Sequence, residues 1–332
     1  MLVNIFIPLM FTLIPIILFV RFPISIANPT SRGLHHKPTA SSGGIAILIG
    51  YVAITISAMI LHGHNLTTNS MILPMVLASL LGFFDDKVSL SKITRFVIQT
   101  ILAIWIIYIN PELPSYIKIF WLLLVIYFIN IYNFMDGING LATSQAIFTL
   151  ISMIILDNYY GINQIIILLI PLLVFLIFNI SPAKIFLGNA GSYLIAILLI
   201  MLFYRSSHID NNYLNIDFYI SMFIILTVFI CDSSYTLLSR LIHQYSHLNK
   251  NFISSLKCIT NPHRTHNYQI MAEKLGNHNT VTIFIMLYNF FWCLPLAFLS
   301  QTYSQLSIVF LLLSYIPYGI LCFKNKAGVE NR

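Results

Sequence analysis

One polar segment of the sequence pairs two carboxylates at the end of an apolar run. Asp85 and Asp86 directly follow the run that ends at Phe84. Adjacent carboxylates at a membrane edge are costly unless they meet a cation or share a proton. Mg²⁺ prefers carboxylate oxygens and completes its shell with substrate phosphates. The pair therefore predicts a hard-cation site, with a solvated helix end as the alternative.

A second segment places Asn133, Asp136 and Asn139 at a spacing of three residues. Helical spacing would put these side chains on one face. Gly137 and Gly140 interrupt that helix and favour a loop in which backbone approaches a ligand closely. A plain glycine turn, in which Asp136 caps the next helix, is the alternative.

Two further segments have side chains or backbone groups suited to phosphate. Gly188 and Asn189 enter an apolar run, and a glycine turn at a helix start presents free N–H groups to an anion. A simply capped helix start is the alternative. His263, Arg264 and His266 lie in a basic segment, and guanidinium and imidazolium groups suit phosphate oxygens. An ordinary loop against anionic lipid is the alternative there.

The elements that must position these residues are membrane helices. The chain has 332 residues, of which 58% are hydrophobic and 8% are charged, and its mean hydropathy is +0.86. A soluble domain carries about 25% charged residues, and it cannot hide this much apolar surface from water. A soluble enzyme, a disordered chain and a nucleic-acid-binding domain are excluded, although the net charge is +7.

The apolar stretches predict an all-α polytopic fold of about ten or eleven transmembrane helices, because a span needs about 17–25 apolar residues. Short stretches are expected to be broken or half-helices. No repeat or linker divides the chain, so a single domain over residues 1–332 is expected. The stretches are Leu2–Val20, Gly44–Leu61, Ile72–Phe84, Phe96–Ile109, Ile119–Tyr132, Leu141–Leu156, Ile165–Phe178, Gly191–Phe203, Phe218–Leu238, Val281–Ser300 and Leu306–Phe323.

The basic residues predict the orientation, because Lys and Arg collect in cytoplasmic loops. With a cytoplasmic C-terminus, only Lys118 and Arg205 of the 17 basic residues lie outside. The opposite orientation would reverse this distribution. All the polar segments then lie on the cytoplasmic side, so the active site is expected at the cytoplasmic face.

These segments, in this order, resemble the polyprenyl-phosphate N-acetylhexosamine-1-phosphate transferases of glycosyltransferase family 4. The resemblance covers about Arg32 to Gln269. It is closest to the O-antigen initiating branch, which is related to phospho-N-acetylmuramoyl-pentapeptide transferase. The segments that carry it are GFFDDKVSLSKITRFVIQ, NFMDGINGLA, IFLGNAGS, CDSSYTLLSRL and NPHRTHNYQ.

The resemblance implies transfer of a sugar-1-phosphate, expected to be an N-acetylated amino sugar, from a UDP-sugar to undecaprenyl phosphate. The products are undecaprenyl-diphosphate-sugar and UMP, and Mg²⁺ is the implied cofactor, with Mn²⁺ as its alternative. The product would initiate a lipid-linked glycan of the cell wall or the lipopolysaccharide O-antigen. The implied location is the bacterial inner membrane, among membrane lipid and without a nucleic-acid partner. A homodimer stays open.

The resemblance also implies roles for individual residues. His263, Arg264 and His266 would hold the diphosphate or the uridine. Which aspartate of the 85–86 pair is the base and which is a metal ligand stays open. Implied catalytic residues are Asp85, Asp86, Asp136 and His263; metal ligands are Asp85, Asp86, Asp136 and Asn189; substrate contacts are Asn133, Asn139, Phe186, Gly188, Arg264 and His266.

Three departures from the family pattern bear on turnover. Asn139 and Asn189 replace family acids, and Ala40 and Ser41 replace a Pro and an Arg of the first loop. An Asn oxygen can bind Mg²⁺ but brings no negative charge, so metal affinity is expected to fall. The main hypothesis is an active transferase. The alternative is a catalytically impaired relative that binds polyprenyl lipid or nucleotide sugar without turnover.

Overall fold

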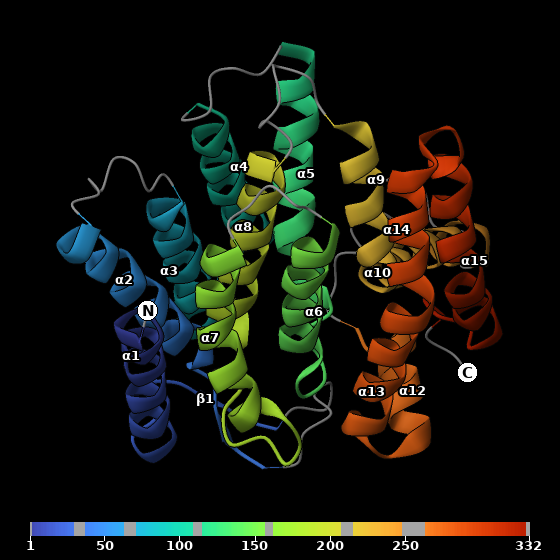
Figure 1. Ribbon diagram of the computed structural model, residues 1–332. Helices are drawn as coiled ribbons and strands as arrows, with labels where there is room; N and C mark the ends of the chain where they lie inside the picture. The colour runs from blue at the N-terminus through green and yellow to red at the C-terminus, as the bar shows by residue number, and fades with distance from the viewer. Residues whose placement is uncertain are drawn as a thin grey trace. The chain divides into compact units, whose positions relative to one another are not determined.

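The chain is almost entirely helical in the computed structural model (Figure 1). Each stretch that the sequence predicts as a span coincides with one helix or with a broken run of helices. Residues 32–36 of the first polar loop lie outside the described residues, as do Asn261 and Pro262 of the last motif. The structure describes residues 2–29, 37–62, 71–108, 115–156, 162–206, 215–247 and 263–329.

The described chain divides into two compact units, whereas the sequence predicts a single domain, which stays a prediction. The first unit contains a short antiparallel pair, β1 (Ile26–Ala27) and β2 (Thr39–Ala40), beside its helices. Its helices are α1 (Leu2–Arg21), α2 (Gly43–His62), α3 (Ile72–Val88), α4 (Lys92–Tyr108), α5 (Ser115–Phe134), α6 (Leu141–Leu156), α7 (Ile162–Asn179) and α8 (Gly188–Ser206).

The second unit consists of the helices from Ile216 onward. Two of its long apolar segments are interrupted by single π-helical turns or by a sharp bend. Its elements are α9 (Ile216–Ile225), α10 (Thr227–Ile242), η2 (His243–His247), α12 (Asn267–Leu275), α13 (His278–Tyr288), η3 (Asn289–Cys293), α14 (Leu294–Thr302), η4 (Ser304–Leu306) and α15 (Ser307–Lys324).

Several described helices are long and apolar enough to cross a membrane. Four segments meet this requirement: Gly43–Ile60, Ile117–Phe134, His278–Thr302 and Ser304–Lys324. The pair α9 and α10, bent by 73°, makes a fifth if it counts as one span. Four more apolar helices are shorter: Ile5–Arg21, Leu141–Leu156, Ile165–Asn179 and Gly188–Tyr204.

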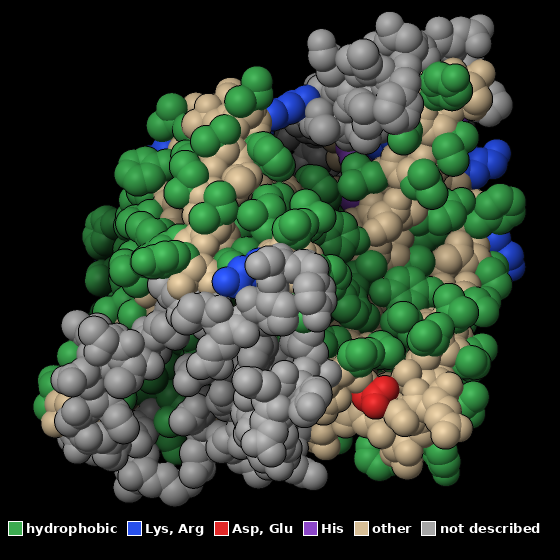
Figure 2. All heavy atoms as spheres, turned by 90° about the horizontal axis from the view of Figure 1, so that it is seen from above, with side chains coloured by type: hydrophobic (Ala, Val, Ile, Leu, Met, Phe, Trp, Pro, Cys, Tyr) green, Lys and Arg blue, Asp and Glu red, His purple; other side chains and the backbone are tan. Residues whose placement is uncertain are grey.

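Large hydrophobic side chains cover much of the exposed surface of these helices. Ile60 is 77% exposed and Phe291 is 77% exposed. Figure 2 shows that hydrophobic side chains dominate the described surface in its view, with few charged groups among them. Apolar patches of this extent mark contact with lipid or protein rather than water. The fold is therefore that of an all-α polytopic membrane protein, as the composition predicts.

Helix α8 is the core of the first unit. Its residues from Tyr193 to Phe203 are all at most 4% exposed, and α8 packs against α2, α3 and α5. A helix that is hydrophobic all round is expected to be buried. Because α8 begins at the polar Gly188–Ser192 segment, burying this helix also sets the position of that segment.

Glycines allow α2 and α3 to approach α8 closely. A methyl group at Gly82 of α3 would overlap the carbonyl oxygen of Asn189, and one at Gly44 of α2 would overlap the backbone of Gly191. In both places the obstacle is backbone, which cannot move aside as a flexible side chain can. The absence of a side chain at Gly82 therefore determines how near Asp85 and Asp86, one turn further on, come to α8.

We predict that Gly82→Ala lowers the stability of the folded protein by about 1–3 kcal/mol, because overpacking a dense interface forces backbone shifts. The measurement is thermal unfolding of the purified protein in detergent. Gly319→Ala on α15 is the control, since a methyl group there would meet its nearest atom, the Cys231 sulfur, at 3.9 Å. Equal unfolding temperatures for the two variants would contradict the close-packing argument.

Candidate functional site

The end of α3 is shaped to bring its own loop back to Asp85. Ser89 adopts a left-handed conformation, with φ 52° and ψ 64°, and its N–H donates to the Asp85 carbonyl oxygen at 3.0 Å. This turn reverses the chain, so the N–H of Leu90 reaches Asp85 Oδ1 at 3.1 Å. The loop after α3 is thus held by the carboxylate that precedes it.

Asp85 is a buried junction between three helices. Its Oδ2 accepts hydrogen bonds from the Asn189 side-chain Nδ2 at 2.9 Å and from the Tyr193 hydroxyl at 3.2 Å, both on α8. Arg95 on α4 brings its guanidinium to 3.5 Å from the same oxygen. Asp85 is only 5% exposed. Both of its oxygens are therefore engaged within the protein.

Asp86 occupies the N-terminus of α8. Its Oδ2 accepts the backbone N–H of Asn189 at 3.0 Å, and its carboxylate also accepts the N–H of Ala190. A negative charge there satisfies unpaired donors and is favoured by the helix dipole. Gly188, at φ +70°, permits this approach, because a methyl group there would lie 2.8 Å from Asp86 Oδ2. The sequence predicts a free anion site at this turn; in the structure, Asp86 takes up two of its donors.

Asp86 and Asp136 are carboxylates whose negative charges are disfavoured by their surroundings. Desolvation raises the pKa of Asp86 to about 7, with a smaller contribution from Asp85. Desolvation and the nearby Asp86 raise the pKa of Asp136, in the turn after α5, well above its usual range. Two carboxylates that both resist ionisation would be stabilised by a divalent cation.

This donor set fits a hard cation such as Mg²⁺, with Mn²⁺ as its alternative. Among the residues that the structure describes, no group of three or more His, Cys, Asp or Glu side chains is gathered as for a metal held by protein alone. Mg²⁺ does not require such a cage, because it is usually bound by one or two carboxylates, waters and substrate phosphates. Asp86 and Asp136 would supply those carboxylates.

The amide of Asn189 bridges two polar groups of the same unit. Its Nδ2 donates to Asp85, and its Oδ1 accepts from Asn133 Nδ2 of α5 at 2.5 Å. An amide suits this place because one end meets an acceptor and the other a donor. A carboxylate at position 189 would instead face Asp85 with like charge. The residue that departs from the family pattern is thus built into the network.

Asn139, Phe186 and the first loop organise the neighbouring turns. Asn139 Nδ2 donates to Ser181 Oγ at 2.6 Å, which ties the turn after α5 to the turn after α7. The N–H of Phe186 donates to the Ala40 carbonyl at 2.7 Å, and its own carbonyl accepts the Gly43 N–H at 3.0 Å. Both residues, predicted as substrate contacts, are seen here holding loops together.

The second unit contains a separate polar network around Asp232 of α10. This residue is fully buried. Its Oδ1 accepts the Asn267 N–H at 3.0 Å, and its Oδ2 accepts the Tyr268 N–H at 2.9 Å and the Tyr318 hydroxyl at 2.9 Å. Asp232 therefore caps α12 from a distant part of the chain. A lone acid in an apolar stretch is the sequence signal for such a residue; Tyr318 had no comparable signal.

The histidines of the last motif are held by this network. His266 Nδ1 lies 3.1 Å from Asp232 Oδ1, so this contact orients its ring. His263 stacks on His266 at 5.0 Å between centroids, and its Nδ1 lies 2.9 Å from Thr265 Oγ1. Burial, His266 and Arg240 lower the pKa of His263 to about 3. His263 is therefore neutral at pH 7 and offers hydrogen bonding rather than charge.

Arg264 carries the positive charge of the motif and is only partly buried. Its guanidinium lies 3.5 Å from the Glu273 carboxylate of α12. Partly exposed ion pairs of this kind contribute little to stability. The pair therefore fixes Arg264 only weakly.

These features describe an all-α membrane protein with buried polar networks, and sequence comparison adds information on its class. The model of glycosyl transferase family 4 matches residues 68–207, which include Asp85, Asp86, Asp136 and Asn189. Over these residues, which are less than half of the chain, the chain is similar to members of that family.

Several bacterial proteins are similar to this chain over more of its length than the family model. The chain is 27% identical over 318 residues to a probable undecaprenyl-phosphate N-acetylglucosaminyl 1-phosphate transferase of Bacillus subtilis. The aligned region covers 88% of this chain and 82% of the relative. It is 27% identical over 278 residues to a phospho-N-acetylmuramoyl-pentapeptide-transferase of Staphylococcus saprophyticus, covering 72% of this chain and 84% of the relative. For the Fervidobacterium nodosum protein of that name, identity is 26% over 242 residues, covering 66% and 75%.

We predict that Asp232→Asn lowers stability by about 1–3 kcal/mol, because an amide nitrogen would face donors that need an acceptor. Thermal unfolding in detergent measures this loss. Glu273→Gln is the control, since its partly exposed pair with Arg264 contributes little. An Asp232→Asn protein as stable as the control would show that Asp232 does not hold α12.

Proposed function

We propose that the protein transfers a sugar-1-phosphate from a UDP-sugar to undecaprenyl phosphate, forming undecaprenyl-diphosphate-sugar and UMP. An oxygen of the lipid phosphate attacks the phosphorus that carries the sugar, and the bond from that phosphorus to UMP breaks. The observation that carries the proposal is the pair of carboxylates Asp86 and Asp136, because desolvation raises the pKa of both and the charge of Asp86 raises that of Asp136 further. The name of the Bacillus subtilis relative includes undecaprenyl phosphate and N-acetylglucosaminyl 1-phosphate, and that of the Staphylococcus saprophyticus relative includes phospho-N-acetylmuramoyl-pentapeptide.

The carboxylates and their neighbours have distinct tasks in this proposal. Asp86 and Asp136 would hold Mg²⁺, and the cation would offset the charge of the phosphates. Asp85 is a positioning residue, because its bonds to Arg95, Asn189 and Leu90 leave it occupied. A phosphate monoester has its second pKa near about 6, so the acceptor is largely dianionic at pH 7. Positioning and charge neutralisation are then the main requirements.

The motif of the second unit takes the donor in this proposal. Arg264 offers its charge to the diphosphate. His263 and His266 offer ring nitrogens as hydrogen-bonding groups, held in place by Thr265 and Asp232. The proposed sugar is an N-acetylated amino sugar, as in the names of the relatives.

The proposed setting is the bacterial cytoplasmic membrane, with the polar segments and the C-terminus on the cytoplasmic side. The distribution of Lys and Arg along the sequence supports this orientation. The product would begin a lipid-linked glycan of the cell surface, with the cell wall or the O-antigen as its destination.

The test is UMP release by the purified protein with undecaprenyl phosphate, Mg²⁺ and a set of UDP-N-acetylhexosamines. We predict that Asp86→Asn and Asp136→Asn each lower the rate about 10²–10³-fold, the usual effect of removing one charge-stabilising group. Asp217→Asn, in the first turn of α9, is the control and keeps the wild-type rate.

Two outcomes would contradict the proposal. Wild-type rates in both carboxylate variants would remove Asp86 and Asp136 from the site. A folded wild-type protein that binds UDP-sugar but releases no UMP with any donor would instead support the non-catalytic alternative.

Asn189→Asp tests how this chain departs from the family pattern. A carboxylate at position 189 would face Asp85 and lower stability without Mg²⁺, and it would bind Mg²⁺ more tightly when the cation is added. Because a ligand stabilises the folded state in proportion to its affinity, we predict that Mg²⁺ raises the unfolding temperature more in Asn189→Asp than in wild type. Equal Mg²⁺-induced shifts in the two proteins would contradict this account of Asn189.

A further inference from the structure

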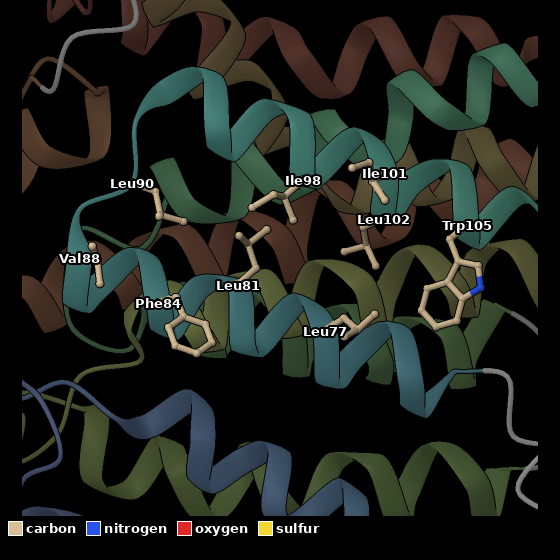
Figure 3. Close-up of a pocket in the computed structure, with 9 residues that line it drawn as sticks. All are labelled: Leu77, Leu81, Phe84, Val88, Leu90, Ile98, Ile101, Leu102 and Trp105. Carbon is tan, nitrogen blue, oxygen red and sulfur yellow. The ribbon is translucent and has the colours of Figure 1, made fainter.

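An apolar groove runs between α3 and α4 of the first unit (Figure 3). Its volume is about 640 Å³, within the range of about 300–1,000 Å³ that is typical of ligand pockets. Figure 3 shows side chains of both helices pointing into it, with Val88 and Leu90 at one end and Trp105 at the other. The groove is lined by Leu77, Leu81, Phe84, Val88, Leu90, Ile98, Ile101, Leu102 and Trp105.

The groove is elongated, and some of the side chains that line it are exposed at the surface of these helices. Leu77 and Val88, which both line it, lie far apart along α3, and the rise of a helix between them is about 16 Å. Phe84 is 54% exposed and Ile101 is 60% exposed, although both line the groove. A narrow, wholly apolar channel of this length suits an extended hydrocarbon chain.

One end of the groove adjoins the charged site. Leu90, a groove residue, donates its N–H to Asp85, and Arg95 of α4 pairs with the same carboxylate. The buried Nε of Arg95 has no hydrogen-bond partner among the described residues. Lys87 adds a second positive charge at the end of α3. The apolar groove therefore ends beside two cationic side chains. One of them, Arg95, has an Nε–H donor without a partner among the described residues.

We propose that this groove binds the isoprenoid chain of the acceptor lipid, with its phosphate at the Arg95 end. The proposal rests on the proposed function for the identity of the lipid. Charge complementarity selects the occupant, because the ligand must be a single apolar chain with a compact anionic head. Chain binding here places the phosphate beside Asp85, on the helix that also carries Asp86.

Filling the groove tests the proposal. Ile101→Trp places a large side chain in it, whereas Ile104→Trp changes an equally exposed residue of α4 that does not line it. UMP release is measured with undecaprenyl phosphate and with geranyl phosphate, whose chain is too short to fill the groove. We expect Ile101→Trp to raise the KM for undecaprenyl phosphate about tenfold, equivalent to losing roughly two buried methylene groups. Its rate with geranyl phosphate and both rates of Ile104→Trp stay near wild type.

A binding measurement separates this inference from the proposed function. In a Trp121→Phe, Trp292→Phe protein, Trp105 is the only tryptophan left. We expect undecaprenyl phosphate that carries a nitroxide on its chain to quench the Trp105 fluorescence saturably. Added unlabelled undecaprenyl phosphate should restore the fluorescence, whereas added phosphatidylglycerol should not.

Recovery by phosphatidylglycerol as well would mean that the groove holds only bulk lipid, and would overturn the inference. Equal effects of the Ile101 and Ile104 variants on KM would also overturn it. If wild type releases no UMP while quenching is saturable and specific, the groove stands and the proposed reaction fails.

Discussion

The first unit depends on the contact between the end of α3 and the start of α8. Asp85 and Asp86 hold this contact from one side, and the backbone and amide of Asn189 hold it from the other. Burying carboxylates is costly unless each is hydrogen-bonded. The cost is met because α8 presents unpaired N–H groups at its N-terminus, and because Gly82 and Gly188 leave room for the approach. The core helix and the charged site are thus positioned by one set of bonds.

In the second unit, a different acidic residue caps a helix in a similar way. Asp232, in the middle of an apolar helix, accepts the N–H groups at the start of α12 and orients His266. In both units a buried acid from one helix caps another that is far away in the sequence. Such caps hold polar segments at fixed places in a protein whose surface is otherwise apolar.

The two carboxylates of the Asp85–Asp86 pair differ in what surrounds them, although they are adjacent in the chain. Asp85 is surrounded by side-chain donors and a guanidinium, so its oxygens are occupied. Asp86 meets backbone donors on one oxygen and the repulsive Asp136 nearby. This difference in surroundings is the basis for proposing a positioning role for Asp85 and a cation-binding role for Asp86. The apolar groove between α3 and α4 ends at Leu90, whose N–H donates to Asp85.

The sequence by itself determined the helices, because membrane spans depend on local hydropathy and every predicted stretch is helical. It also determined which segments are polar, and the ordered motifs pointed to the family. Tertiary structure alone decided the partners of each polar group. That Asp86 caps α8, that Asn189 bridges Asp85 and Asn133, and that Asp232 caps α12 depend on contacts between residues about 30 to 100 positions apart. No local pattern encodes such contacts, because they arise only when buried helices pack and each buried donor must find an acceptor.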